Sequence, residues 1–167
     1  KKRFISQSEP MLKKVNKVKT ALIIGSGSIG QRHIRNLIQT GINDIIALRS
    51  KKGHYKKLPK DLHVIEVSSW DEAIGKKPDI AIISNPTSFH LEAASTISNY
   101  VKGVFIEKPL SNSLDNCQEL IDILKKNQVV SFVGHNLMFH PIIKNIIKFY
   151  DENDVGEIIN IQCQVGQ

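Results

Sequence analysis

The stretch GSGSIG occupies residues 25–30, between the apolar run TALII at 20–24 and the segment QRHIRNLIQTG at 31–41. A short isoleucine-rich run that ends at a glycine indicates a strand buried on both faces. Beyond the glycines, apolar residues recur at helical spacing over residues 28–40, and Gly41 ends the pattern. The sequence therefore predicts a strand, a glycine-rich loop and a helix in direct succession.

A loop of this kind, placed between a strand and a helix, suits the pyrophosphate of a dinucleotide. Gly25 permits the tight turn, Gly27 lets the backbone approach the phosphates, and Gly30 lets the helix pack closely on the strand. The helix N-terminus offers free N–H groups and a partial positive charge. The candidate cofactor-binding residues of the loop are Gly25, Ser26, Gly27, Ser28, Ile29 and Gly30. The alternative is a strand–helix turn that merely happens to be rich in glycine.

Strand and helix patterns alternate along the rest of the chain. Strands are expected at 44–48, 63–67, 79–84, 101–107 and 129–134, and helices at 68–75, 85–98, 113–126 and 141–153. This alternation predicts an α/β protein with a doubly wound parallel sheet, the NAD(P)-binding Rossmann fold.

The last residues follow a different pattern. Residues 157–167 alternate apolar and polar side chains, which is typical of a half-exposed strand in an antiparallel sheet. We therefore expect a basic leader or linker at 1–19, the Rossmann domain at 20–153, and at 154–167 the first strand of a second, antiparallel sheet that is truncated.

Composition and charge exclude several classes of protein. The net charge of the 167 residues is +7, but residues 1–19 hold seven lysines and arginines against Glu9, so +6 of it lies in that segment. A near-neutral remainder argues against a nucleic-acid binder. No apolar run is long enough to span a membrane, and no secretory signal is evident. The widely separated Cys117 and Cys163 suggest a reducing compartment, and we expect a cytoplasmic protein.

The end of the second expected strand bears on the choice of cofactor. An acid about 20 residues beyond the glycine loop would bind the ribose 2′-hydroxyl of NAD. Here the strand ends in ALRSKK, with Arg49 and Ser50 at that place. Arginine can pair with a 2′-phosphate, and serine can donate a hydrogen bond to it. NADP is therefore the preferred cofactor, and NAD is the alternative. If these residues have no role in binding, they form a solvated basic turn.

Polar residues gather where the later strands end, which is the edge of such a sheet that binds ligands. They are Asn85, Pro86 and His90 after the fourth strand, Glu107, Lys108 and Pro109 after the fifth, and His135 and Asn136 after the sixth. We expect Lys108 to be partly buried, which would lower its pKa and suit it to proton transfer. A lysine in a surface turn is the alternative, and each histidine can equally be a cap or a core residue. Pro109 is a candidate for a cis bond. The spacing of these residues predicts no metal site.

Three motifs together resemble the Gfo/Idh/MocA family of NAD(P)-dependent oxidoreductases. They are GSGSIG at 25–30, SNPTSFHLEAA at 84–94 and EKPL at 107–110, and GHNLMFHP at 134–141 is also similar to that family's stretch there. The resemblance implies a Rossmann domain followed by a larger antiparallel α+β C-terminal domain that covers the substrate, so that residues 154–167 would be the first strand of a truncated substrate domain. It also implies hydride transfer to or from a sugar, cyclitol or sugar derivative.

The same resemblance assigns roles to individual residues. Lys108 resembles the family's catalytic lysine, which also contacts substrate, and Glu107 shapes its turn. Asn85, Pro86, His90 and Glu107 match cofactor-binding positions, and His135 and Asn136 match substrate-binding positions. Met138 stands where many relatives carry arginine, and the acid and histidine of the family's second domain have no counterpart before Gln167. We therefore expect the chain alone to turn over poorly and its parent enzyme to be a homo-oligomer. An NAD(P) sensor without catalysis is the alternative function.

Overall fold

The computed structural model describes residues 18–49, 58, 64–153 and 156–164. The chain divides into two compact units, residues 1–134 and residues 135–167. Each unit is described by itself.

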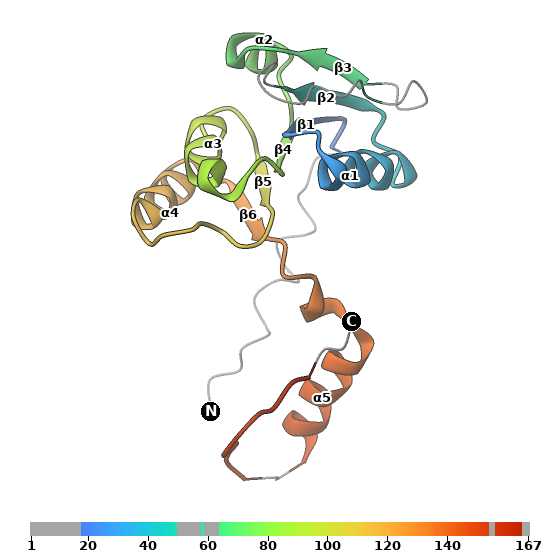
Figure 1. The fold of residues 1–167 in the computed structure, drawn as a ribbon, viewed down its shortest axis with the longest axis vertical. Coiled ribbons are helices and arrows are strands. Elements are labelled where there is room, and N and C mark those ends of the chain that lie inside the picture. Colours follow the sequence, from blue (N-terminus) through green and yellow to red (C-terminus); the bar gives the residue numbers. More distant parts are fainter. Residues whose placement is uncertain (1–17, 50–57, 59–63, 154–155, 165–167) are drawn as a thin grey trace. The chain divides into compact units, whose positions relative to one another are not determined.

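The first unit is built on one six-stranded parallel sheet (Figure 1). Its strands are β1 (Thr20–Ile24), β2 (Asp44–Leu48), β3 (Val64–Val67), β4 (Ile80–Ile83), β5 (Gly103–Ile106) and β6 (Val130–Val133). They lie in the order β3-β2-β1-β4-β5-β6. The strand order reverses between β1 and β4, and such a reversal leaves a crevice at the carboxyl ends of the strands. The predicted fold class is confirmed.

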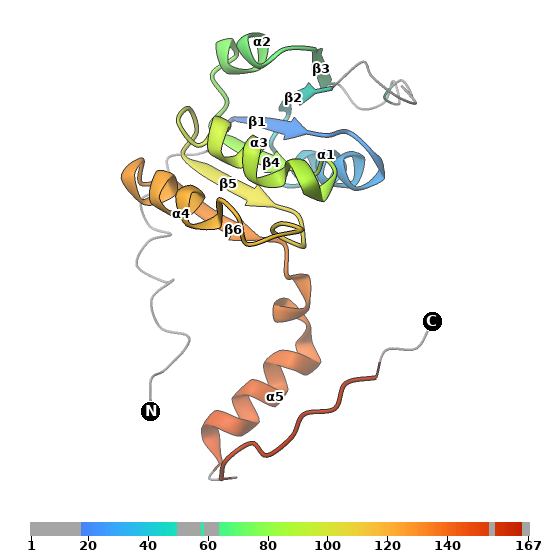
Figure 2. The same cartoon turned by 60° about the vertical axis from the view of Figure 1, so that its left-hand side comes forward.

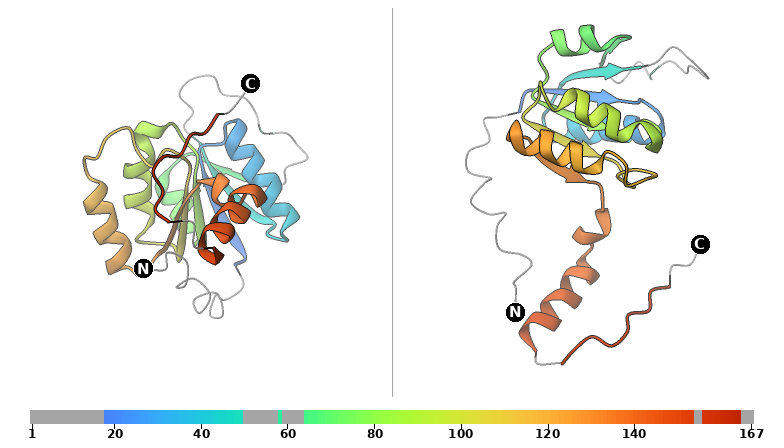
Figure 3. Two further views of the ribbon diagram at one scale, coloured as in Figure 1. Left: turned by 90° about the horizontal axis from the view of Figure 1, so that it is seen from below. Right: turned by 90° about the vertical axis from the view of Figure 1, so that its left-hand side faces the viewer.

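Helices cover both faces of this sheet. The helices of the first unit are α1 (Ser28–Gln39), α2 (Trp70–Gly75), α3 (His90–Ile97) and α4 (Cys117–Lys126), with a 3₁₀ turn, η2, at Thr87–Phe89. Figure 2 shows α3 and α4 on one face and α1 on the other, and Figure 3 shows the sheet between them. One apolar cluster joins the sheet to α2, α3 and α4, and a second joins it to Ile34 and Leu37 of α1. The central strand β1 is buried from Ala21 to Ile24, as its apolar run predicts.

Two helices begin later than predicted. The segment after β4 first makes η2, because Pro86 is extended at φ −59° and ψ 143°, and α3 starts only at His90. Asn85 therefore precedes η2, and the residue before α3 is Phe89. α4 starts at Cys117 because the preceding Asn116 is left-handed, with φ +62°. Leu114, which lies in the predicted helix at 113–126 but before the start of α4, is 90% exposed.

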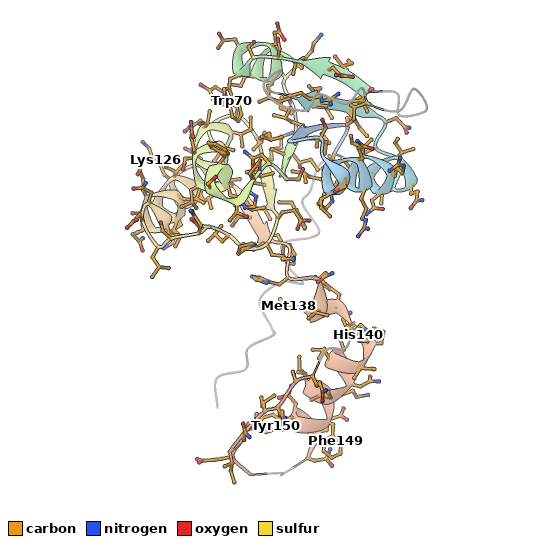
Figure 4. All side chains as sticks on the ribbon, viewed as in Figure 1. Trp70, Lys126, Met138, His140, Phe149 and Tyr150 are labelled. Carbon is orange, nitrogen blue, oxygen red and sulfur yellow. The ribbon has the colours of Figure 1, made fainter. Side chains whose placement is uncertain are left out.

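The second unit holds a 3₁₀ turn, η3 (Asn136–Phe139), and the helix α5 (Pro141–Glu152). Side chains of α5 such as Phe149 and Tyr150 are exposed within this unit (Figure 4). The strand expected at 157–167 is not formed in its described part, residues 157–164. A strand is stable only with a neighbour to take its N–H and C=O groups, and these residues pair with no described strand. No helix among the described residues has the length and apolar character needed to cross a bilayer.

Asp79 ties the starts of three strands together. Its carboxylate accepts hydrogen bonds from Lys102 Nζ at 2.7 Å, from Lys19 N at 3.0 Å and from Thr20 N at 3.2 Å. The bond from the Lys102 side chain, followed by that from the Lys19 backbone, lowers the pKa of Asp79 to about 2. A carboxyl whose pKa is lowered by folding stabilises the fold above its unfolded value of 3.8, and that contribution is lost as the pH falls toward 2.

We expect Asp79→Asn to lower the free energy of unfolding at pH 7 by a modest amount, because the amide keeps only part of these hydrogen bonds. The difference from wild type should shrink between about pH 4 and pH 2, where wild-type Asp79 takes up its proton. Urea unfolding of both proteins at several pH values measures this. A difference that does not depend on pH would mean that the charge of Asp79 contributes nothing.

Candidate functional site

A cavity of about 1040 Å³ opens at the carboxyl ends of β1, β2 and β4. Its wall comes from the glycine loop, from the ends of β1 and β2, and from the segments that follow β3 and β4. Seven of the residues predicted to bind a cofactor line it: Gly25, Ser26, Gly27, Ser28, Arg49, Asn85 and Pro86. The cavity thus lies at the switch point of the strand order, where ligands bind in sheets of this type.

The three glycines of the loop have different surroundings. Gly25 has φ +88°, and a Cβ there would lie 2.5 Å from the Asn85 backbone. A Cβ at Gly30 would run into the carbonyl oxygen of Gly25 and lie 3.0 Å from Ser84 Oγ. A Cβ at Gly27 would meet no described atom within 4 Å. Gly25 and Gly30 are therefore required by packing, whereas the space at Gly27 is free for a ligand.

Ser84 follows β4 and holds the glycine loop through its hydroxyl group. Its hydroxyl lies 2.7 Å from the carbonyl oxygen of Gly25 and 3.3 Å from that of Ile24, so it donates to one or shares its proton between them. The Gly25 N–H donates in addition to the Leu48 carbonyl at 3.3 Å. The loop is therefore held by both strands that flank β1.

Two further features fit the phosphates and polar groups of a nucleotide. No described side chain caps the N-terminus of α1, so its N–H groups remain available to an anion. Asn85 Oδ1 is buried and has no hydrogen-bond partner among the described residues, although its Nδ2 lies 3.4 Å from the Phe89 carbonyl. A buried acceptor without a partner costs about 1–3 kcal/mol, which a ligand hydroxyl or amide would offset. The residues present therefore fit a dinucleotide.

The part of the cavity near β2 and β3 contains residues that sequence analysis missed. Trp70 lines it at the start of α2 (Figure 4), together with Ser68 and Ser69. The signal was available, because SSW follows the third strand and so lies at the same sheet edge as the other candidates. Arg49 lines this part too, and its Nη1 donates to Glu66 Oε2 at 2.9 Å. Ser50 lies outside the described residues.

Four of the described residues that were predicted to bind a cofactor do not line the cavity, namely Ile29, Gly30, His90 and Glu107. Ile29 is 39% exposed on α1, and Gly30 lies under the loop. His90 is only 2% exposed, and its ring nitrogens lie 2.9 Å from the Asn85 carbonyl oxygen and 3.0 Å from that of Pro109. The histidine thus joins the segment after β4 to the segment after β5. His90 contacts the backbone of Asn85 and does not line the cavity.

Glu107 and Lys108 follow β5. Glu107 Oε1 lies 2.7 Å from His33 Nε2 of α1, and its Oε2 accepts the Lys108 N–H at 3.2 Å. The Lys108–Pro109 bond is cis, as predicted. Lys108 is exposed, so the expected partial burial is wrong for this chain. The reason is that β5 ends at Ile106, and Lys108 lies in the segment that follows the strand. His33 was not singled out from the sequence, since nothing there connects it with Glu107.

His135 and Asn136 belong to the second unit, where His135 precedes η3 and Asn136 begins it. All residues that line the cavity belong to the first unit, so these two residues are not among them. No group of three histidine, cysteine or acidic side chains in the described part of the chain is arranged to hold a metal ion.

Comparison with known proteins agrees with this architecture. The family model described as "Oxidoreductase family, NAD-binding Rossmann fold" (GFO_IDH_MocA) matches residues 19–135. The oxidoreductase YrbE of Bacillus subtilis is 31% identical over 137 residues, which are 80% of this chain and 40% of that protein. The scyllo-inositol 2-dehydrogenase (NAD(+)) of Bacillus subtilis is 26% identical, over 82% of this chain and 41% of that protein. The chain thus spans about 40% of the length of these relatives.

Solved structures share the fold. The myo-inositol 2-dehydrogenase of Lactobacillus plantarum superposes with a TM-score of 0.74 and 26% identity, over 86% of this chain and 44% of that one. The scyllo-inositol dehydrogenase of Lactobacillus casei, solved with NAD(H) and scyllo-inositol, gives a TM-score of 0.69 at 22% identity, over 84% and 43% of the two chains. With its motifs, sheet order and family match in agreement, this chain belongs to the Gfo/Idh/MocA family of oxidoreductases with an NAD-binding Rossmann fold.

Proposed function

We propose that this chain is the nucleotide-binding portion of an NAD(P)-dependent oxidoreductase that acts on CH–OH groups of a sugar, cyclitol or sugar derivative. The observation that carries the proposal is the cavity at the β1/β4 switch point. In the described part of the chain, no atom lies within 4 Å of a Cβ placed at Gly27, and no group hydrogen-bonds Asn85 Oδ1. The named relatives that act on inositols support the substrate class.

The predicted site residues have separate roles in this proposal. Gly25, Ser26, Gly27 and Ser28 hold the pyrophosphate against the start of α1, with Ile29 and Gly30 completing the turn. Asn85 and Pro86 contact the cofactor from the segment after β4, supported by His90 and Glu107. A nicotinamide cofactor held by these residues would supply or accept the hydride. Lys108 Nζ hydrogen-bonds the reacting hydroxyl: as the neutral amine it accepts the hydroxyl proton during oxidation, and as the ammonium it donates a proton to the carbonyl oxygen during reduction. His135 and Asn136 bind the substrate.

NADP is the cofactor that we propose as preferred, with NAD also accepted. Arg49 supports this, because its guanidinium forms part of the cavity wall at the end of β2. A guanidinium binds a 2′-phosphate through paired charge-assisted hydrogen bonds. We also infer, for the whole protein, a cytoplasmic location and assembly into a homo-oligomer.

A fluorescence titration of this chain tests the proposal directly. Trp70 is the single tryptophan of the sequence and lines the cavity. Bound NADPH or NADH should therefore quench its emission in a saturable way, and NADPH should bind more tightly. Arg49→Gln should weaken NADPH binding by about tenfold and change NADH binding little, because it removes one charge-assisted contact.

Arg35→Gln is the matched control, since Arg35 is an exposed arginine of α1 that does not line the cavity. It should leave both affinities unchanged. Absence of saturable quenching by either nucleotide would reject the proposed function. Equal or tighter binding of NADH would reject only the preference for NADP.

A further inference from the structure

The arginine that faces the cofactor cavity is already engaged by an acid on the neighbouring strand. Arg49 Nη1 donates to Glu66 Oε2 at 2.9 Å, and the Arg49 side chain is only 10% exposed. Glu66 lies in β3 opposite Ala47, two residues before Arg49, so the two side chains project from the same face of the sheet. The Arg49 N–H also donates to the Val67 carbonyl at 3.0 Å, which fixes the backbone from which the guanidinium extends.

This ion pair changes what Arg49 offers to a ligand. A guanidinium has five N–H donors and can therefore donate to more than one anion. However, a carboxylate in contact with it offsets its positive charge, and the same carboxylate repels a 2′-phosphate that approaches the arginine. The ribose hydroxyl of NAD carries no charge and is not repelled. The pair therefore acts differently on the two cofactors.

We propose that Glu66 is a specificity-determining residue that restrains the preference for NADP. Its carboxylate holds Arg49 at the cavity wall and offsets the charge that would otherwise attract a 2′-phosphate. NAD can then compete at the same site. This inference rests on the proposed function, because it concerns the nucleotide cavity. In sheets of this type, an acid at the end of β2 usually selects NAD over NADP. Here an acid on β3 would influence that choice.

Glu66→Gln tests the inference, because it removes the charge while keeping the length of the side chain. The Trp70 titration is repeated with NADPH and NADH, and with adenosine 2′,5′-bisphosphate and 5′-AMP as competitors that probe the adenosine end alone. We expect the affinity for NADPH and for the bisphosphate to rise about tenfold, since one repulsive charge near a phosphate is removed. The affinities for NADH and 5′-AMP should stay within about twofold.

Two further variants separate a specific effect from a general one. Glu119→Gln makes the same change in net charge at an exposed position of α4 and should alter none of the affinities. Glu66→Thr removes the same carboxylate with a residue that favours strands, and should reproduce the effect of Glu66→Gln. The thermal midpoint of each variant shows that β3 is intact.

The outcomes are distinct. A rise in the ratio of NADPH to NADH affinity in both Glu66 variants supports the inference. An unchanged or lower ratio, in proteins that still bind nucleotide, overturns it and leaves the proposed function standing. Wild-type protein that binds none of the nucleotides overturns the proposed function, and the inference about Glu66 falls with it.

Discussion

Replacing Lys108 by alanine in the complete enzyme is expected to lower kcat by about 10²–10⁴-fold, the usual contribution of one positioned proton-transfer group. Lys108 follows β5 at the carboxyl edge of the sheet and is exposed, so its side chain extends into space that a substrate can occupy. It does not line the nucleotide cavity, and the affinity for NADPH should therefore stay within about twofold of wild type. Steady-state kinetics with a cyclitol or sugar substrate, together with the Trp70 titration, measure both quantities.

Lys126→Ala is the matched control for this experiment. Lys126 is an exposed lysine at the end of α4, and its loss should leave kcat unchanged. If Lys108→Ala also leaves kcat unchanged, another group transfers the proton. If the wild-type enzyme binds cofactor but oxidises no sugar or cyclitol, the chain is better described as a nucleotide sensor.

Replacing the glycines of the loop one at a time should affect two different quantities: the free energy of unfolding at Gly25 and the affinity for NADPH at Gly27. Gly25→Ala is expected to lower the free energy of unfolding by about 2–4 kcal/mol, because it combines a positive φ with overpacking against the Asn85 backbone. Gly27→Ala should leave the free energy of unfolding nearly unchanged, since its methyl group meets no described atom within 4 Å. The same methyl group occupies the space where phosphates would approach the backbone. We therefore expect Gly27→Ala to weaken NADPH binding by about a hundredfold.

Urea unfolding and the Trp70 titration of the two variants test this pair of expectations. Gly41→Ala provides a control for Gly25→Ala, because Gly41 has a similar φ of +86° and no described atom near its Cβ position. It should show the cost of the backbone conformation without that of the clash. If Gly27→Ala binds NADPH as wild type does, the loop is only a turn.

The fold was predictable because its signals are local. The buried apolar runs of β1 and β4, the glycine loop and the helical spacing of α1 are each visible within a few residues, and their order along the chain implies a parallel sheet. The helix starts were less predictable. The delayed starts of α3 and α4 depend on the conformations of Pro86 and Asn116, which apolar spacing does not reveal.

The candidate site was predictable only in part. The residues at the ends of β1, β2 and β4 could be located because all parallel strands end at the same edge. The contacts His33–Glu107, Arg49–Glu66 and Ser84–Gly25 could not, because each joins residues on different elements whose relative position is set by the folded sheet. The strand expected at 157–167 shows the converse: its alternation is clear, but alternation does not supply a pairing partner.

The place of β1 in the sheet has a consequence for the newly made chain. Of the strands that the structure describes, β1 is made before the others, yet it lies in the middle of the sheet, and one of its two neighbours is β4, with Leu22 opposite Ala81. A ribosome must therefore make β2, β3 and α2 before β1 can complete its pairing. Until then an apolar strand presents a free edge, the kind of surface through which nascent chains aggregate. Docking of β4 joins the two halves of the sheet. Contacts between segments this far apart in sequence carry a loop-closure cost, and folds that depend on them form more slowly.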